Sequence, residues 1–144
     1  MTIKVSIVPV TPYQQNCSII RCETTGRAAI VDPGGDSERI LAAVKRMDAT
    51  VEKIILTHAH LDHCAASDLL RRQLGVPIEG PQREDQFWLE QLPQSCQMAG
   101  FPHADAFLVG SALMREPDVD RAVRHLVYGR TKICGLTRAA DAAA

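Results

Sequence analysis

The sequence predicts an α/β domain followed by a short strand, helix and strand. Two observations predict the α/β part: short runs rich in β-branched residues open the chain, and from about residue 37 strand-like runs alternate with segments of helical periodicity. A third observation concerns function. Histidines are grouped directly after one of the strand-like runs, at the place where α/β proteins usually bind their ligands.

Composition limits the size and the partners of the protein. A chain of 144 residues, 46% hydrophobic and 23% charged, can bury one core but has no room for two full domains. Its formal net charge of −1 gives no electrostatic reason to expect nucleic acid or an anionic membrane as partner. A small molecule is therefore the expected partner.

The sequence predicts a cytoplasmic protein. The first ten residues alternate apolar and polar positions, unlike a signal peptide, and no stretch approaches the roughly 20 apolar residues needed to cross a bilayer. The cysteines are odd in number and contain no CxxC pair, so we expect reduced thiols and neither a disulfide framework nor a cysteine zinc site. They are Cys17, Cys22, Cys64, Cys96 and Cys134.

The strands and helices can be placed from residue patterns. Strands are expected over residues 3–8, 17–22 and 27–31, as an antiparallel meander, and again over 51–56 and 76–78. Helical spacing predicts helices over about 37–47, 66–74 and 83–92. Asp36 or Ser37 is the expected cap of the first helix, and Gly75 the expected end of the second.

The segment Thr57-His58-Ala59-His60-Leu61-Asp62-His63 has the spacing of a metal-ligand loop. His58 and His60 stand two apart, so in an extended segment their side chains lie on the same side and can hold one ion. Asp62 and His63 follow as the chain turns toward a helix, and can reach a second ion. These donors suit Zn²⁺, and also Fe or Mn, better than Ca²⁺, so up to two such ions are expected.

Metal ions held in this way lower the pKa of bound water to about 7 and polarise a carbonyl, which is the chemistry of hydrolysis. The alternative is a polar loop that happens to contain histidines. Clustering favours the metal site, because three of the five histidines lie within six residues, immediately after an apolar strand.

Several collinear motifs extend the pattern beyond this loop. They are Gln14-Gln15-Asn16-Cys17, the segment 30–35 ending in Asp32-Pro33-Gly34-Gly35, the segment 54–63, Gly75-Val76-Pro77, Gly80-Pro81 and Asp85-Gln86-Phe87-Trp88-Leu89. In order and spacing, residues 1 to about 103 resemble the amino-terminal half of glyoxalase-II-like proteins of the metallo-β-lactamase fold.

This resemblance implies the first half of an αββα sandwich and a metal-dependent thioester hydrolase acting on a small-molecule thioester. It implies that His58 and His60 bind one metal and that Asp62 and His63 bind the other, with Asp62 also the candidate catalytic residue. Asp32 would lie beneath the site as a support. Alone, its Asp-Pro-Gly-Gly segment reads as an ordinary turn.

Family members supply further ligands from a second half of the sandwich, which does not follow in this sequence. His103 and His125 lack the expected contexts and are interpreted as solvated or packed histidines.

Residues 104–144 instead resemble the junction of bifunctional indole-3-glycerol-phosphate synthase/phosphoribosylanthranilate isomerase. By that resemblance Gly110 and Ser111 match a phosphate-binding turn and Cys134 a general base, although about forty residues cannot form a barrel of about 250.

Three interpretations therefore stay open. The first is a metal-dependent hydrolase whose remaining ligands come from His103, the tail or a second chain. The second is a non-catalytic chimeric or truncated protein, in which half a sandwich leaves a sheet face uncovered and prone to self-association. The third, ranked last, is a tryptophan-biosynthesis fragment.

Overall fold

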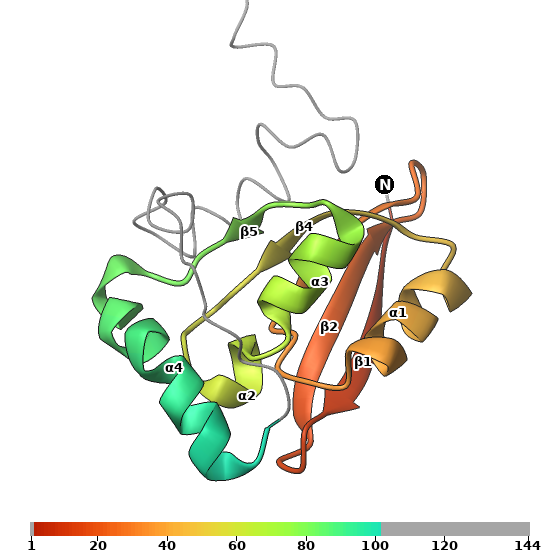
Figure 1. The fold of residues 1–144 in the computed structure, drawn as a ribbon. Coiled ribbons are helices and arrows are strands. Elements are labelled where there is room, and N and C mark those ends of the chain that lie inside the picture. Colours follow the sequence, from red (N-terminus) through yellow and green to blue (C-terminus); the bar gives the residue numbers. More distant parts are fainter. Residues whose placement is uncertain (1, 102–144) are drawn as a thin grey trace, which may run out of the picture.

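The computed structural model describes residues 2–101, which form a five-stranded sheet with helices packed against it (Figure 1). The strands are β1 (Ile3–Val10), β2 (Gln15–Cys22), β3 (Arg27–Val31), β4 (Thr50–Ile55) and β5 (Ile78–Glu79). The helices are α1 (Ser37–Arg46), α2 (Leu61–Cys64), α3 (Ser67–Leu74) and α4 (Gln86–Ala99), with a 3-10 turn η1 (Arg83–Asp85) before α4.

The sheet has the order β1-β2-β3-β4-β5 and changes from antiparallel to parallel at β3. The pairs β1/β2 and β2/β3 are antiparallel, whereas β3/β4 and β4/β5 are parallel. Helix α1 makes the crossover from β3 to β4, as a parallel connection requires. The carboxyl ends of β3 and β4 therefore meet at one edge, and the backbone N–H of Asp32 donates to the carbonyl of Ile55 there at 2.9 Å.

One face of the sheet carries the main core. Alternate residues of each strand point to that face, and the apolar sides of the four helices cover them. The buried strand residues include Val8, Ile19, Ile30 and Ile54, and the helices contribute Ile40, Val44, Leu70, Leu89 and Leu92. All the helices of the described segment thus contribute to a single hydrophobic cluster.

The opposite face of the sheet is only partly covered. Cys22, Ala29 and Ile55 form a second, small cluster there, and Lys53 pairs with Glu79. Toward the β1 edge Ile3, Val5 and Ile7 lie opposite Cys22, Ile20 and Ser18, and they are 43%, 54% and 58% exposed. The self-association expected from such a face stays a prediction.

Every expected strand and helix has a counterpart, but the helix α2 was not expected and β5 covers Ile78–Glu79 instead of residues 76–78. The third predicted helix was expected to end at Leu92, before Pro93, but α4 continues through the proline to Ala99. Leu89, Leu92 and Cys96 all face the core, and their burial outweighs the hydrogen bond that Pro93 cannot donate. Asp36 does precede α1, but its carboxylate accepts a hydrogen bond from the backbone N–H of Thr11 at 2.8 Å and makes none to the helix.

Two further expectations concern residues that the structure describes. No disulfide joins Cys17, Cys22, Cys64 and Cys96, and Cys134 lies outside the described residues. Between residues 2 and 101, no helix combines the length and the apolar character that crossing a membrane requires.

Substitution of a central and a peripheral isoleucine should separate the two faces. Ile30→Ala empties a fully buried position, so we expect the free energy of unfolding to fall by about 2–5 kcal/mol. Ile7→Ala should cost less than about 1 kcal/mol, because Ile7 is 58% exposed. Urea denaturation at two protein concentrations measures both values. Equal losses would mean that the second face is covered in solution.

Candidate metal centre

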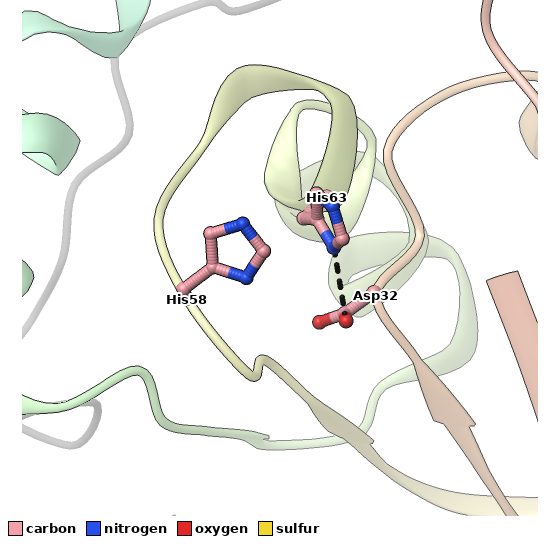
Figure 2. A group of neighbouring side chains, drawn as sticks. All are labelled: Asp32, His58 and His63. Carbon is pink, nitrogen blue, oxygen red and sulfur yellow. Dashed lines mark hydrogen bonds and ion pairs between the residues drawn. The ribbon is translucent and has the colours of Figure 1, made fainter. Parts of the chain in front are cut away.

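Three potential metal ligands converge where β3 and β4 end. Asp32 follows β3 directly, His58 lies in the segment after β4, and His63 lies in the single turn of α2 (Figure 2). Each offers one ligand atom, and these atoms all lie within 4.8 Å of one another. The parallel pairing of β3 and β4 brings Asp32 to the histidine loop although about 25 residues separate them in sequence.

The Asp32 carboxylate holds the loop in place. It is buried and accepts three hydrogen bonds: Oδ1 from the backbone N–H of Thr57 at 2.7 Å, and Oδ2 from Thr57 Oγ1 at 2.6 Å and from His63 Nδ1 at 3.0 Å. A buried carboxylate is stable only when its oxygens are satisfied in this way. Asp32 thus takes the supporting position that the family resemblance implied.

These hydrogen bonds assign the protons of both imidazoles. An ionised carboxylate only accepts, so Thr57 directs its single O–H at Asp32, and His58 Nδ1, 3.0 Å from Thr57 Oγ1, must be the donor to that oxygen. His63 Nδ1 likewise donates to Asp32; the amide nitrogen of Gln15 is farther from it, at 3.3 Å. In its neutral form each ring then has an unprotonated Nε2, which is the form that binds a metal.

The surroundings of His58 also favour its neutral form. Burial, followed by the charges of His63 and His60, lowers the pKa of His58 below its ordinary value, whereas Asp32 and Asp62 act in the opposite direction. Only a neutral imidazole can donate its lone pair to an ion, so the shift favours metal binding at neutral pH.

His60 and Asp62 lie beside this cluster. The ring of His60 is 4.7 Å from that of His58, centroid to centroid, and the rings of His58 and His63 are 3.9 Å apart. Asp62 Oδ2 is 3.7 Å from His63 Nε2. The four residues predicted as ligands are therefore neighbours, while their division into two ion sites stays a prediction.

Gly34 and Cys64 both shape the loop. Gly34 packs against the start of α2, where an added Cβ would overlap the carbonyl oxygen of Asp62, so only glycine lets β3's loop approach this turn. The thiol of Cys64 donates to the carbonyl of His60 at 3.1 Å, and burial raises the pKa of this thiol. Cys64 therefore supports the loop as a protonated thiol.

Sequence analysis missed several residues that hold the site. Thr57 was quoted only as the start of the motif, yet it links Asp32 to His58. Asp85 and Trp88 belonged to the resemblance without a role. Asp85 accepts a hydrogen bond from the backbone N–H of Ala59 at 3.1 Å, and the Trp88 ring lies 5.3 Å from that of His60, nearly perpendicular to it. Asp85 and Trp88 lie far from the loop in sequence, so no local pattern indicated that they contact it.

The tail residues singled out from the sequence lie outside the described residues. These are His103, Gly110, Ser111, His125 and Cys134. Within residues 2–101, the donor set of two neutral imidazoles and neighbouring carboxylates suits a divalent transition metal better than Ca²⁺. The arrangement fits an ion that activates water.

A family model described as the metallo-β-lactamase superfamily matches residues 10–129. The chain belongs to this superfamily. Its fold is similar to that of the BLEG-1 B3 metallo-β-lactamase, with a TM-score of 0.59 and 33% identity over 69% of this chain and 47% of the other. TTHA1623, solved in a di-iron-bound form, gives a TM-score of 0.59 at 26% identity, over 67% and 47% of the two chains.

Two curated relatives match different parts of the chain. The hydroxyacylglutathione hydrolase GloC of Haemophilus influenzae is 43% identical over 104 residues, 72% of this chain and 49% of GloC. The tryptophan biosynthesis protein TrpCF of Yersinia pestis is 62% identical over 40 residues, 28% of this chain and 8% of TrpCF. The chain spans about half the length of GloC and also of the probable metallo-hydrolase YqgX of Bacillus subtilis. The resemblances to a metallo-β-lactamase-fold protein and to TrpCF are both confirmed.

Gly34→Ala should disturb the metal loop specifically. The added methyl group forces the segment after β3 away from α2, so we expect the imidazole NMR signals of His58 and His63 to shift, with a loss of about 1–3 kcal/mol of stability. Gly75→Ala is the control: it strains a positive φ at the end of α3 but meets no atom within 4 Å. Unchanged histidine signals in Gly34→Ala would contradict the proposed close approach.

Thr57→Val should weaken metal binding without removing a donor. The valine cannot accept from His58 Nδ1 or donate to Asp32, so we expect Zn²⁺ affinity to fall by about 10–100-fold, as for other residues that orient ligands. Thr57→Ser keeps the hydroxyl and should retain the affinity. Competition with a chromophoric chelator measures both, and equal affinities for the two variants would exclude the role of the hydroxyl.

Proposed function

We propose that this chain is a metal-dependent hydrolase that cleaves hydroxyacylglutathione or a related thioester. The observation that carries the proposal is the convergence of His58, His63 and Asp32, with His60 and Asp62 beside them, at the carboxyl ends of β3 and β4. The similarity to GloC supports the substrate class.

Each residue has a role in this proposal. His58 and His60 hold one ion, and Asp62 and His63 hold a second, with Zn²⁺ as the first candidate and Fe or Mn as alternatives. Such ions, when bound, lower the pKa of water to about 7 and polarise a carbonyl. Asp32 and Thr57 would hold the Nδ1 protons of neutral His63 and His58, so that Nε2 of each ring remains to bind an ion. The Asp62 carboxylate is the group proposed to take a proton from the attacking water. Its Oδ2 lies 3.7 Å from His63 Nε2.

The donors within residues 2–101 leave positions at such ions open. We propose that further donors come from outside this segment, from the tail or from a second chain. The absence of a disulfide among the four cysteines of residues 2–101 is consistent with the proposal of a reducing compartment such as the cytoplasm.

A second candidate is a chimeric or truncated protein that binds metal without turnover. The match of the last forty residues to TrpCF favours it. A role in tryptophan biosynthesis ranks last, because the matched segment is 8% of TrpCF.

Metal content and thioester hydrolysis test the proposal together. The purified chain, reconstituted with Zn²⁺, Fe²⁺ or Mn²⁺ and dialysed, should hold metal by elemental analysis and release thiol from S-lactoylglutathione. His58→Ala and His63→Ala should each abolish turnover and lower the metal content. His103→Ala and His125→Ala show whether the tail supplies donors.

The outcomes separate the candidates. A chain that holds no metal, with a content unaffected by His58→Ala, contradicts the metal centre. Stable metal binding that depends on His58, without hydrolysis of any thioester, favours the non-catalytic protein.

A further inference from the structure

A small cavity adjoins the candidate metal centre. It has a volume of about 260 Å³, and both His60 and Asp62 line it. A larger hollow of about 840 Å³ lies between α1 and α3, but none of the four predicted metal ligands lines it. The smaller cavity is therefore the one that a group attached to the reacting carbonyl would enter.

Apart from Ser95, the rest of this cavity is apolar and aromatic. Tyr13, from the turn between β1 and β2, lies on one side, and Trp88 and Leu92 from α4 on another, with Leu61 beside Asp62. Tyr13 and Trp88 are 63% and 40% exposed, so both rings present aromatic surface that a ligand in the cavity could contact.

Trp88 is held in position from two sides. Its ring meets that of His60 edge to face at 5.3 Å and 88°, and Phe87 packs against it at 4.8 Å. The exposed indole thus has a fixed orientation next to a predicted metal ligand. Fixed aromatic surfaces bind apolar groups at little cost in side-chain entropy.

The charges around the cavity indicate which part of a thioester it can take. Of the described residues that line it, none is lysine or arginine. Glutathione carries two carboxylates, which basic side chains recognise best. The lining thus suits the acyl side of the substrate better than the peptide side.

We propose that this cavity binds the apolar substituent of the acyl group, so that the site prefers thioesters of aromatic or branched acids to the small lactoyl thioester. This inference rests on the proposed thioesterase function. At about 30 Å³ for each water-sized group, 260 Å³ accommodates a phenyl ring with room to spare. Tyr13, Trp88 and Leu92 would contact this ring, while His60 and Asp62 face the carbonyl.

Fluorescence of Trp88, the only tryptophan of the chain, reports binding directly. The probes are S-benzylglutathione, S-methylglutathione and glutathione, which are not hydrolysed, and each is titrated into the metal-free and the metal-loaded protein. Because burial of a phenyl group removes apolar surface from water, we expect S-benzylglutathione to bind at least about tenfold more tightly than the other two.

A pair of variants on α4 localises the effect. Ser95 lines the cavity, so Ser95→Leu should fill it and abolish the preference for the benzyl group. Gln94→Leu places the same side chain on the exposed side of the helix and should keep the preference. Circular dichroism confirms that both variants fold.

Equal affinities for the benzyl and methyl probes, or an unchanged preference in Ser95→Leu, would overturn the inference. Its failure is distinct from failure of the proposed function. A benzyl preference without any thioester turnover supports the cavity assignment and rejects the hydrolase. Turnover without a benzyl preference supports the hydrolase and rejects the cavity assignment.

Discussion

The site depends on the hydrogen bonds that the buried carboxylate of Asp32 accepts. It joins the end of β3 to the loop after β4 and to α2 through hydrogen bonds to Thr57 and His63. Through Thr57 it also determines which nitrogen of His58 carries the proton. A single charged group thus fixes the position of the loop and the chemical state of two imidazoles, as carboxylates behind metal-binding histidines commonly do.

Much of the fold could be predicted because its signals are local. The alternation of β2 and β3, the helical spacing of α1 and α3, and Gly75 at the end of α3 all appear within a few residues of the element they determine. The prediction ended the third helix too early, since burial of Cys96 beyond Leu92 depends on tertiary packing that periodicity alone does not reveal.

The histidine loop was recognisable for the same reason: its four candidate ligands lie within six residues. Three residues that support the loop were not recognisable, because they reach it from distant elements. They are Gln15, Asp85 and Trp88. The resemblance marked those segments but gave them no role. Gly34 shows the limit most clearly, since an ordinary turn and a close backbone contact with α2 have the same sequence.

All the donors that converge here belong to one continuous stretch of chain, from Asp32 to His63. The four proposed ligands lie within six residues of one another, and Asp32 reaches them through hydrogen bonds, so an ion bound to them would close only short loops. The ion would therefore brace one β-α-β unit and contribute little to holding distant parts of the chain together. Such a unit carries its cation-binding groups with it wherever a gene rearrangement moves it.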